Sequence, residues 1–130
     1  MPTVLVVDDE PLVRTMLRTV LEQAGYAVAE ADDGYHGLAA LKRQDINVVI
    51  TDIMMPNKDG IETIREIRRD HPGIGIVAMS GGGTSGDMLY LRIARALGAD
   101  RILEKPMLPC ELLDAVSSIR SDQPAALPVD

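Results

Sequence analysis

The segment TVLVVDDE, residues 3–10, shows the pattern on which the fold of this chain depends. Its first five residues, Thr3–Val7, are aliphatic or β-branched without interruption. Such a run is typical of a parallel strand that is buried on both faces of a sheet. Three acids, Asp8–Glu10, come next, followed by Pro11, and proline is favoured at the first position of a helix. We therefore expect a buried strand, an acidic loop and a helix, with helix capping as the favoured role of Glu10.

The alternation of strand and helix continues along the chain. Apolar residues at helical spacing follow each of four further strands, which we expect at Ala27–Ala31, Val48–Asp52, Ile74–Ser80 and Arg101–Glu104. The second strand is the weakest of these and suits an edge of the sheet. Gly25 is expected to cap the first helix in a left-handed conformation, and Gly98 to end the fourth. This order predicts an α/β fold with a doubly wound parallel sheet and helices on both faces.

Composition restricts the class of protein. With 130 residues, of which 46% are hydrophobic and 25% charged, the chain is long enough for one folded domain. The net charge of −7 argues against direct binding to nucleic acid, because that binding depends on clustered cations. No apolar run is long enough to cross a membrane, and residues 1–4, MPTV, lack the basic start of a secretory signal. We therefore expect a cytoplasmic protein that binds neither nucleic acid nor membrane.

Polar residues stand where four of the expected strands end. Asp8 and Asp9 follow the first strand, and the third, fourth and fifth strands lead to Asp52, Ser80 and Lys105. Because the carboxyl ends of parallel strands share one edge of the sheet, we expect these side chains to meet there. Three carboxylates in one place repel one another, so such a site raises a pKa or binds a cation.

The ligand set at this edge contains only oxygen, which suits Mg²⁺ or Mn²⁺ better than zinc. A metal held by Asp8, Asp9 and Asp52 is also able to hold a phosphoryl group. Lys105 would then supply a compensating charge, and Ser80 a hydrogen bond. In that arrangement one carboxylate is the nucleophile and an aspartyl phosphate forms.

These residues resemble the receiver domain of two-component response regulators, in its stand-alone, single-domain form. The resemblance covers roughly residues 3–120, with motifs in the family's order: Asp8-Asp9, Asp52-Ile53-Met54-Met55-Pro56, Asp59-Gly60, Ser80-Gly81, Gly98-Ala99-Asp100 and Lys105-Pro106. It implies a flavodoxin-like sheet of five parallel strands in the order 2-1-3-4-5. It also implies a receiver domain over residues 1–120, and residues 121–130 read as a flexible C-terminal tail.

The resemblance implies a role for each matching residue. Asp52 accepts the phosphoryl group, and Asp8 and Asp9 hold Mg²⁺ together with Asp52 and the backbone carbonyl of Met54. Lys105 pairs with a phosphoryl oxygen.

Two further residues flank the phosphoryl group in the family pattern. Ser80 stands at the family's switch position, with Gly81 beside it, and the bond between Lys105 and Pro106 is expected to be cis.

The phosphodonor would be a histidine kinase or a histidine phosphotransfer protein, and the downstream target a protein. Such a chain is a phosphoacceptor switch, with only slow self-phosphorylation and self-dephosphorylation, and either a monomer or a homodimer.

Three features depart from the family pattern. The family places Tyr or Phe three residues before the lysine, where this chain has Ile102, and commonly Phe after the proline, where it has Met107. The loop Gly81–Gly86 is rich in glycine and slightly long. We hypothesise that this loop, and not a coupled movement of hydroxyl and aromatic ring, carries the switch.

Apolar residues near the lysine allow two interpretations. Ile102, Met107 and Leu108, with Tyr90, either form a small patch for a partner or pack in the ordinary way. Leu108 also occupies the cap position before Pro109, where its side chain is unable to accept a hydrogen bond from the helix.

Three other functions are compatible with parts of the sequence. A degenerate receiver would bind partners without phosphorylation. A hydrolase of the haloacid dehalogenase type would form an aspartyl phosphate, but it carries a second Asp two residues after the nucleophile, where this chain has Met54. A flavodoxin-type electron carrier would share the topology, but the acids after the first strand would repel the phosphate of FMN.

Overall fold

The structure is a computed structural model, and it describes residues 2–54, 59–81 and 85–122. Ten elements alternate along the chain: β1 (Thr3–Val7), α1 (Pro11–Gln23), β2 (Ala27–Ala31), α2 (Gly34–Arg43), β3 (Val48–Asp52), α3 (Gly60–Asp70), β4 (Gly75–Ser80), α4 (Ser85–Leu97), β5 (Arg101–Glu104) and α5 (Pro109–Asp122). All five predicted strands are present, and only the fourth differs, because β4 begins at Gly75 instead of Ile74.

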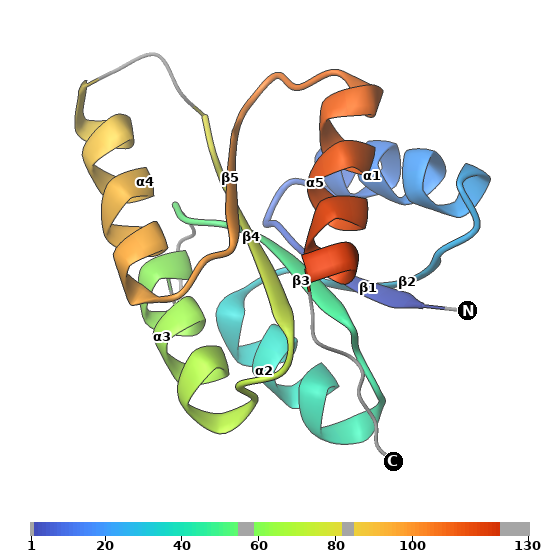
Figure 1. The fold of residues 1–130 in the computed structure, drawn as a ribbon, viewed down its shortest axis with the longest axis horizontal. Helices are drawn as coiled ribbons and strands as arrows, with labels where there is room; N and C mark the ends of the chain where they lie inside the picture. The colour runs from blue at the N-terminus through green and yellow to red at the C-terminus, as the bar shows by residue number, and fades with distance from the viewer. Residues whose placement is uncertain (1, 55–58, 82–84, 123–130) are drawn as a thin grey trace.

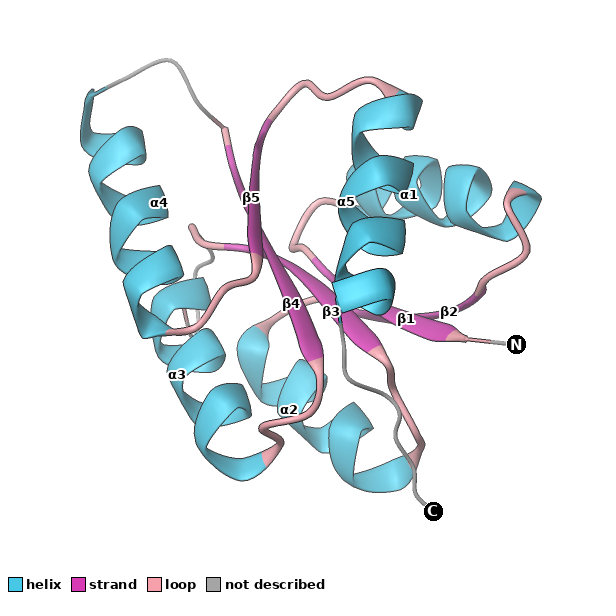
Figure 2. Cartoon of the chain, in the orientation of Figure 1, coloured by secondary structure: helices cyan, strands magenta, loops and turns pink. Residues whose placement is uncertain are grey.

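The strands form one parallel sheet in the order β2-β1-β3-β4-β5, which confirms the predicted doubly wound topology. The weak strand Ala27–Ala31 is indeed at an edge. Helices α1 and α5 cover one face of the sheet, and α2, α3 and α4 cover the other (Figures 1 and 2). Each helical connection brings the chain back to the same end of the sheet. All five strands therefore run in parallel and end at one edge.

The core consists of two aliphatic layers, one on each face of the sheet. Along β1 the side chains alternate: Leu5 and Val7 belong to the layer under α2–α4, and Val4 and Val6 to the layer under α1 and α5. Burial of each such side chain contributes about 1.5–3 kcal/mol relative to exposure. The central strands thus form a rigid base for the loops that follow them.

The two glycines expected at the C-terminal ends of α1 and α4 are found there. Gly25 and Gly98 have φ of 98° and 130°, the left-handed conformation that glycine adopts without a steric penalty. Helix α2 begins at Gly34, because the Asp33 side chain accepts the backbone N–H of His36 and caps the helix.

The capping interactions at the N-terminal ends of α1 and α5 differ from those expected from the sequence. Glu10 precedes α1 but its side chain makes no capping hydrogen bond, so the capping role expected for Glu10 is wrong; Pro11, which has no N–H to satisfy, occupies the start of the helix. At α5 the backbone N–H of Leu108 donates to Glu111 Oε1 at 2.7 Å. This contact is the reciprocal half of a capping box, so a side chain does support the α5 terminus despite the leucine.

The C-terminal helix α5 continues to Asp122, beyond the boundary expected at residue 120. The rest of the predicted tail, residues 123–130, lies outside the described residues. Among the helices of the described ranges, none combines the length and the hydropathy required to span a bilayer.

Candidate functional site

Three carboxylates meet at the carboxyl edge of the sheet. Asp8 and Asp9 follow β1, and Asp52 is the last residue of the neighbouring strand β3. One carboxylate oxygen of each acid lies within 4.8 Å of one oxygen of each of the others. Asp8 is fully buried and Asp52 is 5% exposed, whereas Asp9 is open to solvent. The predicted convergence of the acids is therefore confirmed.

Lys105 reaches this group from the far edge of the sheet. It follows β5, so its side chain extends past the end of β4 to the acids on β1 and β3. The Nζ atom lies 2.9 Å from Asp8 Oδ2 and 3.0 Å from Asp52 Oδ2. Glu10 Oε1 is farther, at 3.8 Å. One ammonium thus bridges the two buried carboxylates, so within the described part of the chain the acids outnumber their cationic partner.

Backbone donors hold the other oxygen of each buried acid. The N–H of Glu10 donates to Asp8 Oδ1 at 2.9 Å, and the N–H of Met54 donates to Asp52 Oδ1 at 3.1 Å. These bonds fix both carboxylates in orientation. Because an ionised carboxylate has about four acceptor positions, each still has lone pairs for a cation.

The surroundings shift the protonation equilibria of two groups. Burial raises the pKa of Asp52 above its usual value of 3.8, and the Asp8 charge adds to this, although the Met54 N–H and the Lys105 ammonium act in the opposite direction. Burial lowers the pKa of Lys105, but its hydrogen bonds to Asp8 and Asp52 outweigh this and hold it above 10.5. The lysine is therefore a permanent cation at neutral pH, and burial makes ionisation of Asp52 less favourable than in water.

The residues present fit a hard divalent cation. Among the described residues, the groups that converge are three carboxylates, which outnumber the Lys105 ammonium beside them, and Asp9 is exposed to solvent. Oxygen donors of this kind suit Mg²⁺ or Mn²⁺. Asp8, Asp9 and Asp52 are thus the residues that could hold such an ion, with Met54 next to them in contact with Asp52.

The fourth and fifth strands bring their predicted residues to the same edge. Ser80 is the last residue of β4 and is buried, and its carbonyl accepts the backbone N–H of Lys105 at 2.7 Å. The peptide bond between Lys105 and Pro106 is cis, the form that the family resemblance implies.

Gly81 is exposed and, with Lys105, lines a hollow of about 330 Å³ against α1. The centre of the proposed switch loop, residues 82–84, lies outside the described residues.

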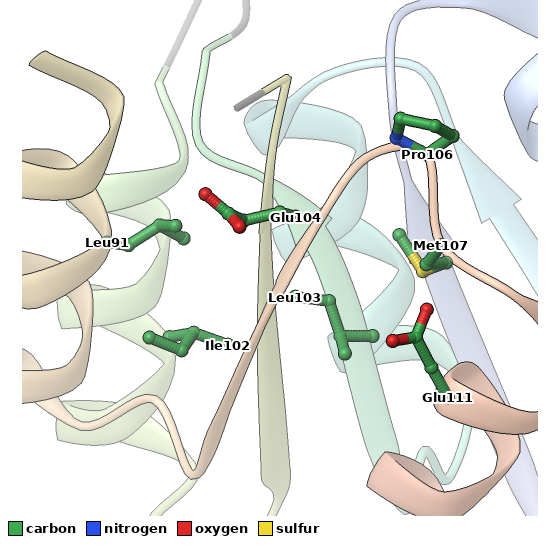
Figure 3. Close-up of a pocket in the computed structure, with 7 residues that line it drawn as sticks. All are labelled: Leu91, Ile102, Leu103, Glu104, Pro106, Met107 and Glu111. Carbon is green, nitrogen blue, oxygen red and sulfur yellow. The ribbon is translucent and has the colours of Figure 1, made fainter. Parts of the chain in front are cut away.

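Ile102, which replaces the usual aromatic residue, borders a hollow of about 370 Å³ lined by Leu91, Ile102, Leu103, Glu104, Pro106, Met107 and Glu111 (Figure 3). Ile102 points toward α4 (Figure 3) and packs against the layer under α2–α4, whereas Met107 packs against the layer under α1 and α5. Each packs partly buried against a different core layer. Leu108, 63% exposed, lines a smaller hollow against α1 with Met107. The structure thus favours ordinary packing for Ile102 and Met107.

Sequence reasoning missed two residues that support the site. Gly60 appears in the sequence only as part of the motif Asp59-Gly60, in which Asp59 caps α3 by accepting the N–H of Glu62. In addition, a Cβ at Gly60 would lie 2.3 Å from the backbone oxygen of Asp52, so only glycine fits beside the end of β3. Arg14 on α1 donates to the backbone oxygen of Asp8 at 2.6 Å. Both contacts involve backbone atoms, which no spacing of side chains reveals.

Comparison with known proteins gives one consistent family. Residues 4–117 match the Response regulator receiver domain. The Aerobic respiration control protein ArcA of Escherichia coli (strain K12) is 35% identical over 111 residues, and the match covers 85% of this chain and 45% of that protein. The Chemotaxis protein CheY of Halobacterium salinarum is 34% identical over 116 residues, covering 89% of this chain and 94% of that protein.

Solved structures agree with the sequence relatives. A receiver domain protein (CheY-like) from Methanospirillum hungatei JF-1 superposes with a TM-score of 0.86 at 25% identity, covering 95% of this chain and 96% of that one. The chain spans less than half the length of several of its curated relatives, such as ArcA. The domain match nevertheless covers most of its residues, and the chain belongs to the receiver domain family of response regulators.

Proposed function

We propose that Asp52 accepts a phosphoryl group from the phosphohistidine of a histidine kinase or histidine phosphotransfer protein, and that this phosphorylation switches the binding of a protein target. The observation that carries the proposal is the Lys105 ammonium, 2.9 Å from Asp8 and 3.0 Å from Asp52 within a group of three carboxylates. Such a group has both a nucleophile and the charges that phosphoryl transfer requires.

In the proposed transfer, an oxygen of Asp52 attacks phosphorus and forms the new P–O bond. The P–N bond to the donor histidine breaks, and its electron pair remains on the imidazole nitrogen, which takes up a proton. The Lys105 ammonium, already beside Asp52, pairs with a phosphoryl oxygen, and Ser80 at the neighbouring strand end donates a hydrogen bond. Mg²⁺, held by Asp8, Asp9, Asp52 and the Met54 carbonyl, would neutralise charge on the phosphoryl oxygens when bound.

The partners belong to the same proposal. A protein target is favoured over direct contact with nucleic acid, because the chain carries a net charge of −7. A cytoplasmic location, and either a monomer or a homodimer, are consistent with this role. One observation supports a second candidate: Ile102 stands in place of the aromatic residue, which favours a binding module that works without phosphorylation. Met54, in place of a second acid, argues against a hydrolase.

The test is incubation of the purified chain with acetyl phosphate and Mg²⁺, followed by intact mass spectrometry. We expect one hydroxylamine-labile phosphoryl group, which EDTA prevents and Asp52→Asn abolishes. Asp59→Asn is the matched control, because asparagine caps a helix as well as aspartate does and residue 59 is outside the acidic group. Absence of uptake by a folded wild-type chain would favour the binding module, and rapid multiple turnover of phosphate esters would favour the hydrolase.

A further inference from the structure

We infer that Arg14 is a positioning residue for the metal ligands Asp8 and Asp9, because its guanidinium holds the peptide plane that joins them. This inference rests on the proposed function, since it concerns the site at which Mg²⁺ would bind. Arg14 lies on α1, outside the group of three carboxylates. Its Nη1 donates to the backbone oxygen of Asp8 at 2.6 Å.

The contact acts on both acids at once. The carbonyl of Asp8 and the N–H of Asp9 belong to one rigid peptide unit, so a bond to that carbonyl orients the start of Asp9 as well. On its other side Asp8 is tied to β2, because its N–H donates to the carbonyl of Ala31 at 3.1 Å. Asp8 is therefore held by its backbone at both ends, and Arg14 supplies the bond nearest to Asp9.

Glu30 keeps the guanidinium of Arg14 in place. The Nε atom of Arg14 donates to Glu30 Oε1 at 3.1 Å, and only the planar fork of arginine allows it to bind Glu30 and Asp8 in fixed relative directions. Burial of Arg14 is substantial, with 17% of the side chain exposed. The contact is thus a supporting interaction of the kind that orients metal ligands, and loss of such partners typically lowers metal affinity about 10- to 100-fold.

Arg18 provides a matched control on the same network. It also pairs with Glu30 through Nη1, but its Nε pairs with Glu22 and its Nη2 donates to the carbonyl of Val28, so Arg18 makes no bond to the acidic loop among the described residues. Substitution of either arginine removes one positive charge and one bond to Glu30. Only substitution of Arg14 removes a bond to Asp8.

The two possible effects of Arg14 have opposite signs. If Arg14 acted only through its charge, its removal would strengthen cation binding, because a nearby positive charge would be gone. If it positions Asp8 and Asp9, its removal weakens cation binding. The direction of the change therefore separates the two explanations.

The experiment measures Mn²⁺ binding to the full chain by electron paramagnetic resonance, for the wild type, Arg14→Gln and Arg18→Gln. We expect the Kd of Arg14→Gln to rise about tenfold and that of Arg18→Gln to change less than about twofold. Amide hydrogen exchange of Glu10, whose N–H donates to Asp8 Oδ1, should be faster without metal in Arg14→Gln only. Equal or tighter Mn²⁺ binding by folded Arg14→Gln, with unchanged exchange at Glu10, would overturn the inference.

Two further outcomes are separable. If Arg14→Gln does not fold, Arg14→Lys retains the charge but not the fork, and the same weakening and faster exchange are expected. If the wild type binds no Mn²⁺ and takes up no phosphoryl group, the proposed function fails. The exchange of the Glu10 amide still decides whether Arg14 positions the loop, because it is measured without metal.

Discussion

Replacement of Lys105 by methionine should destabilise the metal-free protein strongly at neutral pH. Methionine retains much of the length and apolar stem of lysine but removes the ammonium between Asp8 and Asp52. Both acids are nearly inaccessible to water, with Asp8 fully buried and Asp52 5% exposed. The substitution therefore leaves two neighbouring buried carboxylates without their cation.

The distances give the size of the effect. At 2.9 and 3.0 Å, with an effective dielectric constant of about 20, each attraction amounts to about 6 kcal/mol before desolvation is subtracted. Loss of one partner from a buried ion pair costs about 3–5 kcal/mol net. Lys105 is itself 17% exposed, so we expect the lower value, about 3 kcal/mol. For a domain of this size that is a decrease in Tm of about 10 °C.

The assay is urea unfolding in EDTA, followed by far-ultraviolet circular dichroism because the chain has no Trp. Lys42→Met, at an exposed position on α2, is the control and should change the free energy of unfolding by less than about 0.5 kcal/mol. The pKa of Lys105 is raised above 10.5, so its contribution is present below that pH and lost as pH rises through the folded value. Equal stability of Lys105→Met and Lys42→Met at neutral pH would refute the reasoning.

Two further substitutions test the ends of the strands. Because burial raises the pKa of Asp52 above 3.8, the folded state binds its proton more readily than the unfolded state, and stability falls as pH rises through this range. Asp52→Asn should therefore be more stable than the wild type in EDTA at neutral pH, and urea titrations should show that gain disappear below about pH 4. Gly60→Ala should lose about 3 kcal/mol by the same assay, because the new Cβ meets backbone of Asp52, whereas Gly73→Ala, with open space around it, should change little.

The sheet was predictable because each strand is specified locally. Val48–Asp52, for example, is an apolar run that ends on a single acid, and its bounds in the structure are those predicted. Helix termini were less predictable, because a cap depends on which side chain reaches back to the backbone. Asp33 does so and Glu10 does not, although both acids precede a helix. Sequence alone does not separate these cases, since the difference lies in the local backbone direction.

The acidic group was predictable for a different reason. Parallel strands must end at one edge, so Asp8, Asp52 and Lys105 had to lie near one another once the topology was inferred. The supporting residues were not predictable, because they act through contacts that topology does not specify. Gly60 is required because a side chain at this position would collide with the backbone of Asp52. Arg14 acts through a hydrogen bond to the carbonyl of Asp8, six residues earlier in the chain.

The site's charge connects these predictions. Among the described residues, three carboxylates lie beside one ammonium, and the repulsion between the acids would favour binding of a divalent cation. Loss of an acid such as Asp52 should therefore raise stability and lower cation affinity together. Loss of Lys105 should do the reverse, because it increases the same repulsion. Added Mg²⁺ should thus narrow the difference in unfolding free energy between Lys105→Met and the wild type and reverse the advantage of Asp52→Asn.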